Sequence, residues 1–167
     1  MRTLIALMLT LMCSVVTAGA EEHAFTLFSA DLPDGWGGDE KEGFTFGEGG
    51  EGYMLILTCP GADGESIAAA VSLFVLPNIH HDDSATHAAK LAKLQENASA
   101  PRPDGPFWAF TGQPHSRSID APAVTRVNVT PEKALIAIVQ DTGEHGAEQV
   151  FRSVRGLTDE SRTLLGQ

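Results

Sequence analysis

The stretch NIHHDDSATH, residues 78–87, brings together side chains of the types that bind zinc and copper in proteins. If a helix begins near Asp83, then Asp83 and His87 lie one turn apart on one helix face. His81, beside His80 and just upstream, could fold over that pair and give a three-ligand site with an open position for Zn(II) or Cu(II). The alternative is an ordinary helix start, because acidic residues favour the positive end of a helix and histidines tolerate solvated loops. We favour the helix start, and a divalent metal site remains the competing hypothesis.

A second metal hypothesis concerns His23 and depends on how the N-terminal segment is processed. Residues 1–20 have the pattern of a signal peptide, with Arg2, an apolar run at 4–16 and a small-x-small site at 18–20. Cleavage after Ala20 would make Glu-Glu-His the new N-terminus, with His23 third. The α-amine, two backbone amides and the imidazole would then form a square-planar set of four nitrogens, which suits Cu(II) or Ni(II). A cut one residue away would abolish this site.

Cys59 is the one cysteine of residues 21–167, so no disulfide can form within that part of the chain. It could act as a nucleophile if His115 or His145 approached it together with an orienting acid. The surrounding LTCPG, however, matches no cysteine-hydrolase motif and is typical of a strand that runs into a turn. We therefore expect Cys59 to be a small, buried apolar side chain on the strand face that also carries Tyr53, Leu55 and Leu57.

The glycine-rich stretch GEGGEG, residues 47–52, spells the G-x-G-x-x-G dinucleotide fingerprint. That motif binds a pyrophosphate when a helix follows it, because the helix N-terminus supplies the positive end of a dipole. Here the next residues, YMLILT, have the length and composition of a strand, and Glu48 and Glu51 would face the anion. A turn between two paired strands needs only the positive φ angles that glycine adopts easily. The stretch therefore predicts a hairpin and no nucleotide site.

Apolar periodicity locates the elements that must position these residues. Alternating or two-sided apolar runs predict strands at 25–29, 44–46, 53–59, 67–76, 107–111, 124–130 and 134–140. Helical spacing predicts helices at 84–96 and 147–155. The segment ADLPDGWGGDEKEG, residues 30–43, predicts a turn-rich acidic loop. Strands that follow strands through short turns predict a single α+β domain over residues 21–167. We expect a mostly antiparallel β-sheet flanked by helices, an α-β-α arrangement with the order ββββαβββα.

Several stretches together carry a family resemblance. They are a strand closed by LPDGW at 32–36, hairpins at 44–58 and 55–76, a helix near 88–94, FWAFTG at 107–112, ALIAIV at 134–139 and VFRSVR at 150–155. In order and hydrophobic texture they resemble the PsbP-like fold superfamily, which includes the PsbP photosystem subunit, a eukaryotic Ran-binding regulator and the DcrB-type bacterial envelope proteins. The resemblance spans nearly all of residues 21–167 and carries no catalytic motif. It implies an α-β-α arrangement around an antiparallel sheet and a role as an accessory or binding protein.

The charge balance bears on the kind of partner. The chain has 22 acidic and 11 basic side chains, a formal charge of −11, which repels phosphate backbones and anionic lipid headgroups. We therefore expect no nucleic-acid partner and no stable membrane insertion once residues 1–20 are removed. A cation or a basic protein partner suits the charge better.

Together these features predict an exported protein, periplasmic or secreted, that performs no catalysis and binds a protein partner in the cell envelope. We expect the binding surface to be the acidic loop with Asp34, Asp39, Glu40 and Glu42. The alternative function is sequestration or delivery of copper, nickel or zinc through His23 or the cluster from His80 to His87. A Cys59-dependent enzyme is the third hypothesis, and no reactive motif supports it.

Overall fold

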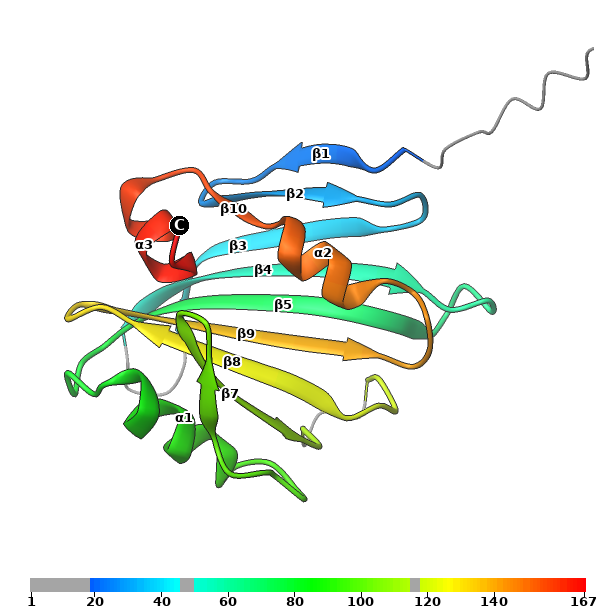
Figure 1. Ribbon diagram of the computed structural model, residues 1–167. Coiled ribbons are helices and arrows are strands. Elements are labelled where there is room, and N and C mark those ends of the chain that lie inside the picture. Colours follow the sequence, from blue (N-terminus) through cyan, green and yellow to red (C-terminus); the bar gives the residue numbers. More distant parts are fainter. Residues whose placement is uncertain (1–18, 46–49, 115–117) are drawn as a thin grey trace, which may run out of the picture.

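The computed structural model describes residues 19–45, 50–114 and 118–167 (Figure 1). An antiparallel sheet of seven strands forms its centre. The chain builds one half of this sheet, crosses to the far edge and returns, so that β5 and β9 become neighbours. The sequence prediction of a mostly antiparallel α+β fold is confirmed. In spatial order the strands are β3 (Gly37–Thr45), β4 (Glu51–Pro60), β5 (Ile67–Pro77), β9 (Lys133–Asp141), β8 (Ala123–Val129), β7 (Phe107–Gly112) and β6 (Arg102–Asp104).

One face of the sheet, here called the helical face, carries the main hydrophobic core. Helices α2 (Ala147–Ser153) and α3 (Asp159–Leu165) cover it, together with a small sheet of β1 (Glu21–Ala24), β2 (Phe28–Leu32) and β10 (Arg155–Gly156) (Figure 1). Alternate residues of each central strand point to this face. Full burial of one such side chain stabilises the fold by about 2 kcal/mol. The fully buried side chains include Leu55, Leu57, Val71, Leu73 and Leu135.

The opposite face is covered in part by helix α1 (Ser84–Ala92), which lies over β7 and β8. Its residue Ala88 packs with Phe110 and Val127, which point away from the helical face. Helices therefore flank the sheet on both sides. The helix begins as the sequence predicts, because the Asp83 carboxylate accepts a hydrogen bond from the Thr86 N–H at 2.7 Å. It ends earlier than predicted, because residues 93–96 turn to bring Glu96 into a bridge with Gln113.

The prediction of an acidic loop at residues 30–43 is wrong over most of its length. Residues from Gly37 onward form strand β3, which pairs with β4 and contains a bulge at Gly43, where φ is 63°. A tight turn occupies the preceding residues, with the Trp36 N–H donating to the carbonyl of Pro33. β3 is an edge strand with nearly every residue exposed, so it lacks the apolar alternation by which strands are recognised. Strands β1, β6 and β10 were likewise not predicted.

The fingerprint-like stretch lies between two paired strands. Thr45 pairs with Glu51 and Phe44 with Gly52 in antiparallel register, and the strand β4 runs through Gly52 to Pro60. The pairing of these two flanks agrees with the predicted hairpin, and residues 46–49 between them lie outside the described residues. The predicted signal peptide, of which residues 1–18 are not described, stays a prediction. Among the described residues, the helices are too short or too polar for any of them to span a lipid bilayer.

Candidate functional site: a groove beside helix α2

Several side chains of the hypothetical metal cluster at residues 78–87 have other partners in the structure. The Asp83 carboxylate caps α1, and Nδ1 of His81 turns to the carbonyl oxygen of Pro131 at 2.9 Å. Asp82 forms an ion pair with Lys90, and His80 is exposed in the turn before the helix. His87 is half-buried with an unpartnered Nδ1, and burial lowers its pKa. Within the described ranges, no three histidine, cysteine or acidic side chains are arranged to hold a metal ion.

His23 lies in strand β1, which pairs with β2 from Glu21 opposite Leu32 to Ala24 opposite Ser29. The Glu22 carboxylate also accepts a hydrogen bond from the Ser29 hydroxyl at 3.0 Å. A four-nitrogen copper site would require these residues to leave the extended strand and wrap around the ion. The hypothesis of an amino-terminal copper site stays a prediction, and strand pairing opposes it.

The four acidic residues predicted to bind a partner do not share one surface. Asp34 lies in the turn before β3, and Asp39 and Glu42 are opposite Ile56 and Tyr53, on different faces of the strand. Glu40 is committed to the fold, because its carboxylate accepts hydrogen bonds from the Thr26 N–H and the Tyr53 hydroxyl, both at 2.8 Å. The Thr26 bond, with that of Tyr53, holds the pKa of Glu40 below its ordinary value.

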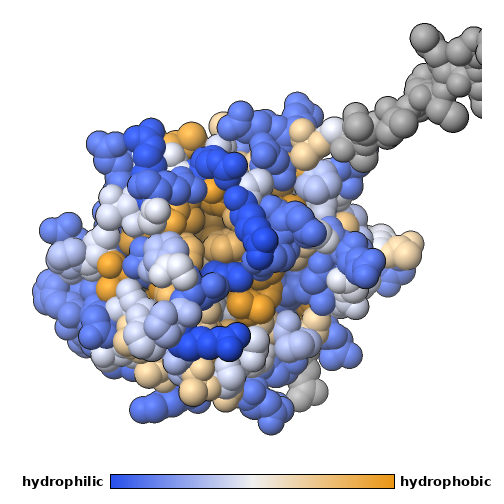
Figure 2. All heavy atoms as spheres, in the orientation of Figure 1, coloured by the Kyte–Doolittle hydropathy of each residue, from blue (hydrophilic) through white to orange (hydrophobic). Residues whose placement is uncertain are grey.

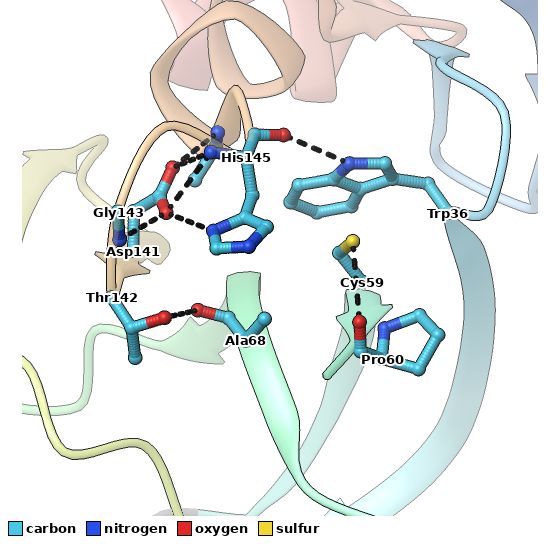
Figure 3. Close-up of polar contacts among 9 residues, drawn as sticks. Trp36, Cys59, Pro60, Ala68, Asp141, Thr142, Gly143 and His145 are labelled. Carbon is cyan, nitrogen blue, oxygen red and sulfur yellow. Dashed lines mark hydrogen bonds and ion pairs between the residues drawn. The ribbon is translucent and has the colours of Figure 1, made fainter. Parts of the chain in front are cut away.

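Cys59 lies near the same end of the sheet as His145, as Figure 3 shows. The register aligns Cys59 with Ala69 and Ala69 with Asp141, and the indole N–H of Trp36 donates to the His145 carbonyl at 3.1 Å. The thiol is free, partly buried and packed against the core, and it donates to the Pro60 carbonyl at 3.7 Å. Asp141 pairs with His145 and could orient it as the base for a thiol nucleophile. His115 lies outside the described residues. Thiol chemistry at Cys59 stays a prediction.

Asp141 organises the loop that leads from β9 into α2 (Figure 3). Its carboxylate accepts hydrogen bonds from the backbone N–H groups of Gly143, His145 and Ala147, at 3.0 to 3.3 Å. It is also 2.9 Å from Nδ1 of His145. Partial burial raises the pKa of Asp141, but these hydrogen bonds outweigh it and hold the pKa below the ordinary value. The loop therefore keeps a negative charge at the start of α2.

Two hollows share a lining residue on β8, and one of them lies against α2. Figure 2 shows the side of the molecule that carries α2, where hydrophobic residues are visible between hydrophilic ones. The first, the arginine hollow, has a volume of ≈ 650 Å³ between β6, β7 and β8. The second, the acidic hollow, has a volume of ≈ 670 Å³ between β8, β9 and α2. Val124 lines both, so we call the two together the groove. The arginine hollow is lined by Arg102, Asp104, Thr111 and Arg126, and the acidic hollow by Asp141, Glu144, Glu148 and Gln149.

Arg126 joins the two hollows and holds the groove together. Its guanidinium donates to both carboxylate oxygens of Glu148, at 3.0 and 3.1 Å, and its Nε donates to Asp104 at 2.9 Å. The same group lies over the ring of Phe151, 4.8 Å from the ring centroid. The Arg126 side chain is 11% exposed, so these partners replace most of its hydration. Three elements, β8, the β6–β7 hairpin and α2, are thereby fixed around the groove.

Sequence reasoning missed the residues that build this groove, above all Arg126, Asp141 and Glu148. One signal was available in AVTRVNV, residues 123–129, where Arg126 is the one charged residue of a strand rich in valine. A charge at such a position implies a partner on the same face. The partner itself could not be identified, because Glu148 lies on a helix that tertiary packing brings to β8.

Comparisons with known proteins identify no relative of this chain. No protein-family model matches it, and neither a curated protein nor a solved structure does. The resemblance to the PsbP-like superfamily therefore stays a prediction, and the proposed function depends on the chain's own geometry.

Proposed function

We propose that this chain acts, after export, as a non-enzymatic binding protein that holds a basic segment of a protein partner in the groove. One observation carries the proposal: Asp141, Glu144 and Glu148 line the acidic hollow, and among the described residues no lysine or arginine lines it. The formal charge of −11 adds a long-range attraction for basic ligands. Export is supported by the signal-like pattern of residues 1–20.

The three carboxylates have different roles in this proposal. Asp141 is engaged by its own loop, and Glu148 by Arg126 and Arg152. Glu144 is exposed at the rim, so we assign to it the direct ion pair with a lysine or arginine of the partner. The apolar stem of such a side chain would pack on Val124, which lines both hollows.

The arginine hollow extends the site, so that a segment several residues long fits. The two hollows share Val124 of β8 in their linings, which are largely polar with a few apolar side chains such as Ala109 and Val139. A binding site of this kind orients its ligand by polar contacts and gains affinity from apolar ones. Arg102 is exposed at the far end and suits an acidic or carbonyl group of the same segment.

A displayed peptide library tests the proposal. The protein lacking residues 1–20 is immobilised and panned, and the enriched peptides are expected to carry lysine or arginine. Synthetic versions are then titrated against the protein and against Glu144→Lys. Reversal of one rim charge is expected to weaken binding by roughly tenfold.

The matched control is Glu132→Lys, which makes the same charge change at an exposed position in the β8–β9 turn. It is expected to bind the peptides as the unaltered protein does. Enrichment of neutral or acidic peptides would contradict the proposal. Equal weakening in Glu144→Lys and Glu132→Lys would mean that net charge, and not the groove, attracts the peptides.

A further inference from the structure

Most of the charged side chains that line the groove are paired within the protein. In the described part of the chain these side chains are Arg102, Asp104, Arg126, Asp141, Glu144 and Glu148. Arg126 binds both Asp104 and Glu148, and Asp141 is held by His145 and by the backbone of its own loop. Among the described residues, no ion pair or hydrogen bond engages the side chain of Arg102 or of Glu144. Each hollow therefore has one unpaired charge, and the two charges are opposite.

The unpaired arginine lies among groups that suit a carboxylate. Arg102 is opposite Ala109 of β7, which is opposite Arg126 of β8, so both arginines are on the helical face of the sheet. Ser99 and Thr111 bring hydroxyl groups to the same hollow. The Ser99 oxygen accepts a hydrogen bond from the Thr111 N–H at 3.0 Å, which leaves its own O–H to donate to a ligand. Since a planar guanidinium binds a carboxylate through two parallel hydrogen bonds, the arginine hollow has the donors for one such group.

We propose that the partner segment carries a carboxylate as well as a basic side chain, and that Arg102 binds the carboxylate while Glu144 binds the basic group. This inference rests on the proposed function, in which Glu144 holds a lysine or arginine of the partner. A segment that is basic throughout would set like charges together at Arg102, which disfavours its binding. The groove therefore selects a ligand for opposite charges at two positions and not for net positive charge.

The register of the sheet gives the spacing of these two charges in the ligand. One row across β6, β7, β8 and β9 consists of Arg102, Ala109, Arg126 and Ala137. Asp141 ends β9 four residues beyond Ala137, and Glu144 follows in the loop to α2. Neighbouring strands are about 4.8 Å apart and successive residues about 3.4 Å apart, so the backbones of Arg102 and Asp141 are separated by about 20 Å. Because long side chains cover part of this distance, the basic residue and the carboxylate are expected about four to six positions apart in an extended segment.

Panning of a displayed peptide library against three forms of the protein lacking residues 1–20 tests the two charge positions. The library has free C-termini, so that either a side chain or the C-terminus can supply the carboxylate. Peptides enriched on the unaltered protein are expected to have a basic residue and a carboxylate at the spacing given above. On Arg102→Glu, a second basic residue is expected in place of the carboxylate. On Glu144→Lys, an acidic residue is expected in place of the basic residue, while the carboxylate for Arg102 is retained.

Titration of one enriched peptide, made synthetically, measures the contribution of Arg102. Arg102→Glu is expected to weaken its binding by roughly tenfold. The peptide is also made with an amidated C-terminus and, separately, with each acidic side chain replaced by its amide. The carboxylate that Arg102 binds is the one whose removal weakens binding to the unaltered protein but not to Arg102→Gln. The matched control is Lys41→Glu, which makes the same charge change as Arg102→Glu at an exposed position of β3, the opposite edge strand, and is expected to bind as the unaltered protein does.

The outcomes separate this inference from the proposed function. Enriched peptides that carry basic residues but no carboxylate at a fixed spacing would overturn the inference and leave the proposed function standing. Enriched peptides without basic residues would contradict both. Equal weakening by Arg102→Glu and Lys41→Glu would also overturn the inference, because net charge would then account for the effect.

Discussion

Arg126 on β8 and Glu148 on α2 form a two-bond ion pair across the groove, with Nη1 to Oε2 at 3.1 Å and Nη2 to Oε1 at 3.0 Å. Two parallel bonds restrict the relative orientation of strand and helix more than a single contact does. Arg126 also holds Asp104 of the β6–β7 hairpin, so one guanidinium connects both walls of the groove. The shape of the binding site and the stability of the fold therefore depend on the same side chain.

Replacing Arg126 tests this connection. Arg126→Met leaves Asp104 and Glu148 without their nearest cation, and both are at least one-third exposed, so water compensates in part. We expect the free energy of unfolding to fall by about 2 kcal/mol, measured by urea denaturation at neutral pH. The control is Arg152→Met, which removes an arginine from the same Glu148 but at a side chain that is 75% exposed. It is expected to cost less than about 0.5 kcal/mol, and equal losses would assign no special role to Arg126.

The substitution Asp141→Asn tests the loop before α2, and its effect on the free energy of unfolding is expected to depend on pH. The folded pKa of Asp141 is depressed, so its charge stabilises the fold above the unfolded pKa of about 3.9. This contribution is lost as the pH falls through the depressed folded value. We expect the variant to be less stable by about 1–2 kcal/mol at neutral pH, with the difference shrinking in acid. Urea denaturation at both pH values measures it, with the exposed Asp34→Asn as control. A difference independent of pH would show that the carboxylate's charge is unimportant.

We expect the folded protein to lose stability in weak acid because of His87. Burial lowers its folded pKa, so the unfolded chain binds a proton more readily than the folded one. The neutral side chain allows full stability above the unfolded pKa of about 6.5, and stability is lost as the pH falls from there through the lowered folded value. His87→Gln removes this titration, so its thermal midpoint is expected to change less between neutral pH and pH of about 5. If the thermal midpoints of the variant and the unaltered protein change equally with pH, His87 is not the origin of the acid sensitivity.

The amino-terminal copper hypothesis is tested by comparing the copper affinity of a short N-terminal peptide with that of the folded domain. A synthetic peptide of residues 21–27 is free to wrap around Cu(II), whereas the folded domain must first detach β1 from β2. We expect the peptide to bind copper more tightly by roughly tenfold or more, since strand detachment costs on the order of 1–2 kcal/mol. Visible absorbance during competition between peptide and domain measures this, and a His23→Ala peptide is the control. Equal affinities would mean that β1 does not restrain His23.

Local pattern was enough to predict several elements of the fold. The strands at β4, β5, β7, β8 and β9 follow apolar runs, and the start of α1 follows its acidic cap. The glycine-rich stretch between β3 and β4 was correctly separated from the dinucleotide motif, because a strand and not a helix follows it. In each case the residues that decide the structure are close in the chain.

The elements that the sequence did not predict depend on distant partners. Strand β3 is exposed on both sides and is recognisable only through its backbone pairing with β4. The short β10 exists because it pairs with β2, more than a hundred residues earlier. The cluster at residues 78–87 has the composition of a metal site, yet its side chains are engaged elsewhere by Pro131, Thr86 and Lys90.

By itself, the amino-acid sequence determined the class of the fold, the acidic character of the chain and the signal-peptide pattern of residues 1–20, because these follow from composition and short-range periodicity. The tertiary structure decided which charges meet. Arg126 and Glu148 are separated by 22 positions, and nothing in the chain around Arg126 identifies Glu148 as its partner. Ion pairs depend on distance in space, and only the packing of α2 onto the sheet sets that distance. The groove is for the same reason a property of the folded protein that no local stretch of sequence encodes.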